Sequence, residues 1–577
     1  MRGVAVALVG LLAAAPAWAR RPRTVAPSSS QVPRLQTFGE QGTLNYQFSQ
    51  TERVEVSSTP TIVSVSSRHH TPTMGWFPMR VSIDNTGGPK QTMTLVFRSL
   101  GGGASSEVKR VVEVAAGERR SITLSVPAEL HWGQFEASSP VIGRQSQALG
   151  FTSIYGASRL VLAYGSPEAF EVFARKKPDN TNGEDQVLTM ALDEAPTELA
   201  AYLGFHAVAL VDPRGLEGLS DAQRAALEAW VATGGSLVLQ SRPATPALLP
   251  LLEGDGPTHR YGFGAVTVLD EDASFASVPL SQLPVEPLGQ LESRGTRRSR
   301  LEGTSTFEAL LPQAIVPVAR FLVIITLFTL LIGPGSVFIA RKRGPAVLLA
   351  TIPITAFATC VLILGSSVLL DGFRVHAVTY GYTLLDRAQH RAVTLGLSGW
   401  YANLAPRTAS FDGSTGVIAP RRNGEPTPVS LEWRDGARFG AGFVPSRTYR
   451  EWGIASVAPS RARLVARREG SRVVLQNALG ERIDVVWVRL DGALYVARDV
   501  RDGGEATLER DDRVDETGLA LEAGRRFVAA YTSPVVMAPL DDGQFLARVQ
   551  GTAFVPMGGV SADVHAAQHV VRGEVEP

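Results

Sequence analysis

The chain has 577 residues, and its 56 lysines and arginines almost balance its 55 aspartates and glutamates. This balance gives the chain no overall field that would attract nucleic acid, so we expect no nucleic-acid partner. The one cysteine, Cys360, lies inside an apolar run. The sequence therefore excludes a disulfide and a thiol catalytic site outside that run.

The N-terminus has the pattern of a secretory signal. Arg2 precedes the apolar residues 4–15, and Ala17-Trp18-Ala19 follows. A charged start, an apolar run and an A-x-A site predict a signal peptide at residues 1–19, with an uncleaved anchor as the alternative. Residues 20–34 are rich in Pro, Ser and Arg and predict a linker.

Residues 35–150 show short alternating strands separated by turns, and this spacing favours a β-sandwich of immunoglobulin-like shape. The expected strands are 79–84, 92–97, 107–114 and 121–126. His69 and His70 are adjacent, and adjacent residues of a strand point to opposite faces. We therefore expect no shared metal ion there.

The pattern changes at residues 156–270, where apolar strands alternate with helices. This order indicates an α/β layer with a mainly parallel sheet. The helix 220–233 is the most clearly marked element. Ser220 and Gln223 form a capping box, Leu227 and Trp230 lie on the apolar face, and glycines follow the helix.

One run in this region resembles a known family. It reads Leu219-Ser-Asp-Ala-Gln223, then Leu227-Glu-Ala-Trp230-Val231, then Gly234-Gly235. The chain here is similar to the class I glutamine-amidotransferase-like domain of exported bacterial membrane proteins. The resemblance implies a flavodoxin-like α/β fold. It does not carry over the activity, because the catalytic cysteine is absent.

Polar residues follow the expected parallel strands, at the edge where ligands of α/β sheets bind. They are Ser166, Asp193, Asp212 and Ser241. We take these four as candidate ligand-binding residues, although helix capping and turn formation explain the same residue types. Ser241 lacks the flanking glycines of a nucleophile elbow. His206 and His259 lie nearby without an evident catalytic partner.

Residues 271–317 predict a juxtamembrane connector, and two uncharged apolar runs follow at 321–340 and 345–370. Each is long enough to cross a hydrocarbon core of about 30 Å. The turn at 341–344 contains Arg341, Lys342 and Arg343, which the positive-inside rule places in the cytoplasm. Both flanking regions would then lie outside. An arginine cluster at 294–300 argues weakly for the opposite orientation.

Residues 374–577 again show short strands and predict one or two further β-sandwich units. His565 and His569 are four residues apart and would share the face of a helix. Ala566 stands where a zinc protease has glutamate, so we expect no metal here. No phosphate loop or dinucleotide fingerprint occurs in the sequence.

These patterns predict a multidomain α/β plus β protein of the bacterial inner membrane, with two spans and most of its mass outside. We expect no cofactor and no catalysis. The expected partners are the lipid bilayer and other envelope or membrane proteins. Two alternatives stay open, a ligand-sensing or accessory subunit of a transport system and a hydrolase or amidase with a rearranged site. The sequence does not give the oligomeric state.

Overall fold

The ranges of the chain that this computed structural model describes are discontinuous. They are 53–57, 60–66, 70–71, 75–99, 106–127, 132–150, 152–153, 160–165, 186–205, 207–211, 214–240, 242–244, 257–269, 311, 318–371, 374–418, 430–511 and 534–577. The predicted signal peptide and linker lie outside these ranges, as does all of the predicted connector except Leu311, which is buried.

A four-stranded antiparallel sheet comes first, in the order β1-β2-β4-β7. Its strands are β1 (Arg53–Ser57), β2 (Ile62–Ser66), β4 (Trp76–Asp84) and β7 (Arg119–Pro127). Six consecutive residues of β4, 76–81, are buried. Burial of consecutive residues indicates that this part of β4 is covered on both faces.

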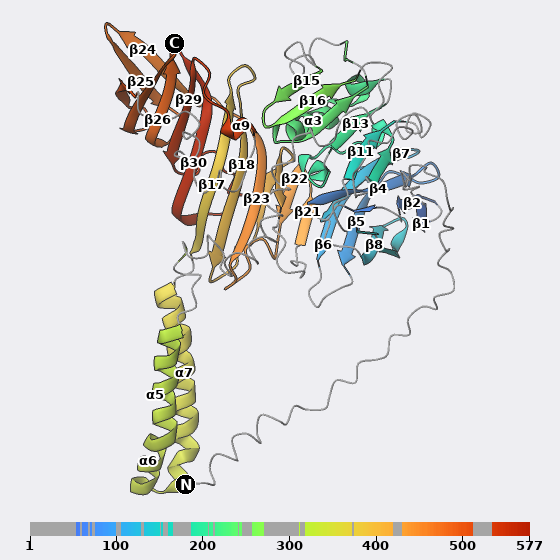
Figure 1. Ribbon diagram of the computed structural model, residues 1–577. Coiled ribbons are helices and arrows are strands. Elements are labelled where there is room, and N and C mark those ends of the chain that lie inside the picture. The colour runs from blue at the N-terminus through green and yellow to red at the C-terminus, as the bar shows by residue number, and fades with distance from the viewer. Residues whose placement is uncertain are drawn as a thin grey trace, which may run out of the picture. The chain divides into compact units, whose positions relative to one another are not determined.

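A seven-stranded sheet combines strands from both ends of the chain, in the order β19-β22-β21-β6-β5-β8-β9. Four strands come from the N-terminal half, β5 (Gln91–Ser99), β6 (Glu107–Val114), β8 (Trp132–Ser139) and β9 (Gly143–Gly150). Three come from the C-terminal half, β19 (Ala409–Asp412), β21 (Ser430–Trp433) and β22 (Gly436–Phe439). The parallel ladder between β6 and β21 joins the two groups (Figure 1).

The central six-stranded sheet has the order β12-β11-β13-β14-β16-β15 and is parallel except for the hairpin β15–β16. Its strands are β11 (Leu160–Tyr164), β12 (Gln186–Met190), β13 (Ala207–Leu210), β14 (Ser236–Leu239), β15 (Thr258–Tyr261) and β16 (Gly264–Val268). Its helical elements are η1 (Leu192–Glu194), η2 (Leu199–Tyr202), η3 (Gly215–Gly218) and α3 (Asp221–Ala232). The predicted capping box of Ser220 and Gln223 is confirmed. The short strands β3 (His70–Thr71) and β10 (Thr152–Ser153) pair in parallel and form a separate two-stranded sheet.

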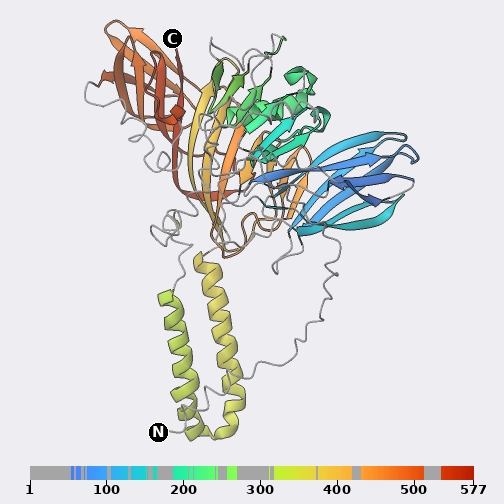
Figure 2. The same ribbon diagram turned by 45° about the vertical axis from the view of Figure 1, so that its right-hand side comes forward.

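Two apolar helical segments form a hairpin. The first comprises α5 (Val318–Leu330), the π turn η8 (Leu331–Gly335) and α6 (Ser336–Arg343). The second comprises η9 (Pro345–Val347) and α7 (Leu348–Asp371), and the two segments lie side by side (Figures 1 and 2). Pro334 lies in the π turn, and both prolines and π turns are sites at which helices kink. Both segments are long and apolar enough to cross a membrane, and almost none of their residues is buried in the protein.

The C-terminal region forms an eleven-stranded sheet, part of which closes on itself. The open part is β17 (Val375–Asp386), β18 (Arg391–Ala402), β20 (Thr415–Ile418) and β23 (Arg450–Pro459). The seven-stranded barrel is β24 (Arg463–Glu469), β25 (Arg472–Ala478), β26 (Arg482–Leu490), β27 (Ala493–Val500), β28 (Glu505–Arg510), β29 (Gln544–Gln550) and β30 (Ala562–Glu576). Strand β30 belongs to both parts, because it pairs with β17, β24 and β29. The one-turn helix α9 (Pro534–Met537) precedes β29.

The predicted fold class is therefore wrong. Among the described residues strands account for 53% and helices for 19%, and there is no central flavodoxin-like domain. A flavodoxin-like sheet has helices on both faces, whereas α3 is the one α-helix of more than a turn that the described residues place on the six-stranded sheet. The predicted C-terminal sandwich is an open sheet fused to a barrel. The predicted N-terminal sandwich shares a sheet with strands from residues 409–439.

Candidate functional site

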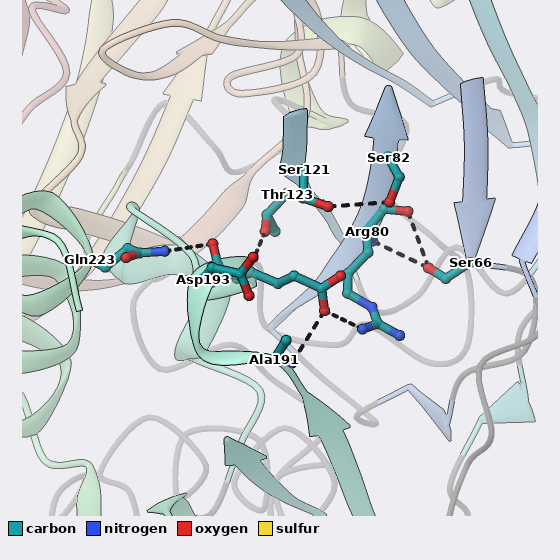
Figure 3. Close-up of polar contacts among 9 residues, drawn as sticks. Ser66, Arg80, Ser82, Ser121, Thr123, Ala191, Asp193 and Gln223 are labelled. Carbon is teal, nitrogen blue, oxygen red and sulfur yellow. Dashed lines mark hydrogen bonds and ion pairs between the residues drawn. The ribbon is translucent and has the colours of Figure 1, made fainter. Parts of the chain in front are cut away.

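Of the four predicted ligand-binding residues, Asp193 alone lies among the described residues. Asp193 lies in η1, directly after β12, with an exposed side chain, and its carbonyl oxygen accepts a hydrogen bond from Gln223 Nε2 at 3.0 Å (Figure 3). Ser166, Asp212 and Ser241 lie outside the described residues. Their grouping at one edge of the sheet stays a prediction.

The residue after Asp193 is the centre of a buried polar layer. Glu194 is buried and forms an ion pair with the buried guanidinium of Arg80. Arg80 comes from β4 and is labelled in Figure 3. The Glu194 carboxylate also accepts the backbone N–H of Ala191 at 3.2 Å. Its carbonyl oxygen accepts the Thr123 hydroxyl of β7, also at 3.2 Å. These contacts join the end of β12 to the four-stranded sheet.

A second ion pair lies beside the first. Arg110 of β6 contacts the buried carboxylate of Glu198 at 2.8 Å and donates to the carbonyl oxygen of Thr123 at 2.7 Å. Glu198 precedes η2, so both acidic residues belong to the turns that follow β12. In the described residues, each carboxylate of this polar layer therefore has an arginine as its counter-charge.

Two buried tyrosines belong to the same region. Burial raises the pKa of Tyr164, the last residue of β11, and that of Tyr202 in η2. Both phenols therefore stay protonated at neutral pH and cannot act as phenolate bases. With the two carboxylates neutralised by arginines, this polar layer connects sheets and does not offer an accessible general base.

Contacts between the chain segments before and after the hairpin extend beyond the β6–β21 ladder. The indole N–H of Trp76 donates to the Val417 carbonyl at 2.9 Å, and that of Trp433 donates to the Ser125 carbonyl at 2.8 Å. The two indole rings meet edge to face with centroids 5.4 Å apart. These hydrogen bonds from two buried tryptophans, each to a backbone carbonyl of the opposite half, fix the register of the two halves.

An arginine of β18 makes a further connection to the central sheet. Arg391 contacts Glu228 of α3 at 3.0 Å and Asp386 at 2.9 Å, and its guanidinium stacks 4.6 Å from the centre of the Tyr261 ring. Tyr261 also donates its hydroxyl to Glu228. Burial and the Glu228 charge raise the pKa of Tyr261, so the phenol remains a donor at neutral pH.

The predicted histidine pair does not lie on a helix. His565 and His569 are in β30, where His565 is exposed and His569 is buried. The Nε2 atom of His565 lies 2.8 Å from Nδ1 of His376 in β17, and His569 Nε2 lies 2.7 Å from the Thr383 hydroxyl. The two histidines thus have separate partners. The described residues contain no group of three or more His, Cys, Asp or Glu arranged to hold a metal ion.

Burial lowers the pKa of His569 from 6.5 to about 3. The folded chain therefore keeps this imidazole neutral, while the unfolded chain protonates it as the pH falls below 6.5. The stabilisation is complete above pH 6.5 and decreases toward pH 3. Between pH 6.5 and about 5 we expect the free energy of unfolding to fall by about 1.5 kcal/mol from this residue.

The His569→Gln variant isolates this effect, because its side chain keeps a donor for Thr383 and does not titrate. Urea unfolding of the detergent-solubilised full chain, followed by tryptophan fluorescence, should show a shallower pH dependence in the variant. Burial and the neighbouring His565 also lower the pKa of His376. His376 is present in both proteins, so its contribution to the pH dependence is the same in each and cancels in the comparison. Equal slopes in the two proteins would mean that His569 is accessible to protons.

Comparisons with known proteins do not identify a family. No protein-family model matches the chain, and no curated protein matches it. One similar solved structure is a cycloisomaltooligosaccharide glucanotransferase of Paenibacillus sp., with 13% identity over 33% of this chain and 27% of that chain, at a TM-score of 0.12. Another is a calcium-binding mutant of Bacteroides uniformis beta-glucuronidase 2, with 11% identity over 34% of this chain and 24% of that chain, at a TM-score of 0.11. TM-scores this low do not show a shared fold, so nothing about this chain follows from these two structures.

Sequence reasoning missed Arg80, Glu194 and Arg391. A signal existed for Arg80, which lies in the strand sequence Trp76-Phe-Pro-Met-Arg80-Val. A charged residue among apolar residues that are buried on both faces needs a counter-charge. The identity of that partner was not predictable, because Glu194 is 114 residues further along the chain.

Proposed function

We propose that this chain is a membrane-anchored protein of the bacterial cell envelope whose two large flanking regions form one platform that binds other proteins outside the membrane. The observation that carries this proposal is the parallel ladder of β6 with β21, since it unites chain from before and after the apolar hairpin in one sheet. Two regions that share a sheet must lie on the same side of a membrane.

Two features support the orientation of the platform. An even number of spans, α5–α6 and α7, brings the chain back to the side from which it entered. The basic residues Arg341, Lys342 and Arg343 end the first span and are exposed. The positive-inside rule then assigns them to the cytoplasm and the sheets to the outside.

Binding rather than catalysis is supported by the way the described polar groups are used. The buried carboxylates Glu194 and Glu198 pair with arginines, and the tyrosines beside them stay protonated. Buried, paired charges hold sheets together but do not reach a substrate. We infer that the interacting surface lies on the outside of the sheets.

The edge strand β9 is the best candidate for that surface. Its residues 143–148 are exposed, and it pairs only with β8 among the described strands. Trp132, at the start of β8, is 57% exposed and covers Gly150, where a Cβ atom would clash with the indole ring. A free strand edge accepts an added strand, and an exposed tryptophan is a common anchor of interfaces.

Co-purification of the full chain from detergent extracts, followed by mass spectrometry, tests this proposal. We expect Trp132→Ala to weaken the binding of a co-purifying envelope protein by about 2 kcal/mol, the loss typical of an interface anchor. Val111→Ala is the matched control, because Val111 is an exposed apolar side chain of the same sheet. Equal recovery of every partner in both variants would contradict the assignment of the binding surface to this edge.

A further inference from the structure

We infer that one end of the eleven-stranded sheet rests on the membrane surface and binds anionic lipid headgroups. This inference depends on the proposed membrane anchoring. The surface, which we call the β17 edge, consists of residues 374–376, 402–408, 445–450 and 562–565. It contains the start of β17, the end of β18, the loop before β23 and the start of β30.

Chain length places the β17 edge close to the bilayer. Helix α7 ends at Asp371, the first charged residue after its apolar sequence, and β17 begins at Val375. Four residues span at most about 14 Å even when fully extended. If α7 crosses the membrane, the start of β17 must therefore lie within about 14 Å of the end of that helix, whatever the angle between them.

Strand register brings the other three segments to the same end of the sheet. Val375 is the partner of Ala402 in β18 and of Ala562 in β30. Ala402 in turn forms an isolated bridge with Ser446. Because neighbouring strands are about 4.8 Å apart, the four segments form one continuous edge.

The exposed side chains of the β17 edge suit a lipid interface. Leu404 is 58% exposed and Val564 is 38% exposed. The four segments contain four arginines, at 374, 407, 447 and 450, and one aspartate, Asp563, which gives a net charge of +3. Arg374 pairs with Asp563 at 3.0 Å, and the partly buried Arg450 donates to the Gly442 carbonyl, so the exposed positive charge lies mainly on Arg407 and Arg447. The combination of exposed apolar side chains with basic ones is typical of surfaces that lie in the headgroup region.

The lipid surface is favoured over a protein as the occupant, because the covalent link to α7 holds the β17 edge beside the bilayer permanently. Basic residues near an anionic surface are attracted to it, so the arginines of the β17 edge add to this preference. A partner protein or a second copy of the chain would instead have to enter the space between the sheet and the membrane. These two occupants are the competing outcomes of the test.

The test uses the full chain, one copy per nanodisc, with a fluorophore attached to a single cysteine. In a Cys360→Ser background, Leu404→Cys reports on the β17 edge. Ala388→Cys is the matched control, since Ala388 is an exposed residue in the turn at the far end of β17. Lipids that carry a quencher near the headgroup are included, with either anionic or zwitterionic headgroups.

We expect about twofold quenching of the label at position 404 in anionic nanodiscs and little at position 388. The Arg407→Glu substitution should reduce the quenching at 404, whereas Arg468→Glu, an exposed arginine of β24, should not. Equal quenching at 404 and 388, or no difference between anionic and zwitterionic lipids, would overturn the inference. Shielding of position 404 that appears only with two copies per disc, or with added partner protein, would overturn it as well.

The native Cys360 separates failure of this inference from failure of the proposed anchoring. Cys360 is exposed on α7, within the second apolar segment. Position 360 lies near the middle of that segment, so lipids that carry the quencher on the acyl chain are used for it, and a label there is quenched if α7 spans the membrane. Quenching at 360 without quenching at 404 rejects only the lipid contact of the β17 edge, and absence of quenching at 360 rejects the anchoring itself.

Discussion

Replacing Glu194 with alanine is expected to lower the local stability of the joined sheets by about 3–5 kcal/mol. The substitution removes this counter-charge from the buried Arg80 guanidinium, and breaking a buried ion pair by deleting one partner is costly. Hydrogen exchange of the full chain measures the effect locally, through loss of amide protection in β4, β7 and β12. The barrel strands have a separate apolar core and provide the internal reference.

Two control variants distinguish the loss of charge pairing from other causes. The double variant Arg80→Met with Glu194→Leu removes both charges and is expected to recover most of the stability. Glu505→Ala breaks the half-exposed pair with Arg467 and should cost at most about 1 kcal/mol. Wild-type protection in the Glu194→Ala chain would mean that water reaches Arg80.

Replacing Trp230 with alanine is expected to have an effect of similar size, about 3–5 kcal/mol. Trp230 is fully buried on α3, its ring lies against Gly235, and its centroid is 6.0 Å from that of Tyr202. Amide protection should fall in α3, η2 and β16, because η2 and β16 are elements on which the helix packs. Unchanged protection in those elements would contradict the packing described for this helix.

The Trp230→Phe variant is the matched control. It keeps an aromatic ring at the site and removes an indole N–H that has no hydrogen-bond partner among the described residues. We therefore expect a loss below about 1.5 kcal/mol. The variant Ser220→Ala removes the helix cap and should cost about 1 kcal/mol.

Local patterns predicted the elements whose signals are local. The apolar runs anticipated the helical hairpin, and the capping box of Ser220 marked the start of α3 within one residue. Strand 107–114 was predicted with the bounds of β6. In each case the periodicity or the cap lies within about 25 residues, the range over which such signals operate.

Strand partners could not be predicted in the same way. The face of β6 shows alternation, but nothing in it specifies that Lys109 stands opposite Glu432, more than 300 residues later. The closing of the barrel depends on β30, whose 15 residues are shared between three partners. A sequence read locally divides into domains at the hairpin, whereas the folded chain pairs strands across it.

The candidate site shows the same difference between local signals, which the sequence reveals, and distant partners, which it does not. The sequence indicated that polar residues collect after the parallel strands, and Asp193 does follow β12. The neighbouring Glu194 is the residue that pairs with Arg80, since the four-stranded sheet packs against that end of β12. Whether a charge serves a ligand or another sheet depends on a segment that lies 114 residues away.

The central claim is that the chain before and after the hairpin forms one sheet outside the membrane. It can be tested with Lys109→Cys and Glu432→Cys in a Cys360→Ser background, since these positions are direct partners across β6 and β21. The account predicts that a disulfide forms spontaneously in intact bacteria, because disulfides form in the oxidising envelope and not in the cytoplasm. Proteolytic cleavage of the chain between the two cysteines should then leave the fragments joined until a reductant is added. A pair that stays reduced even when oxidant is supplied would contradict the shared sheet, and a pair that oxidises only after cell lysis would contradict its location outside the membrane.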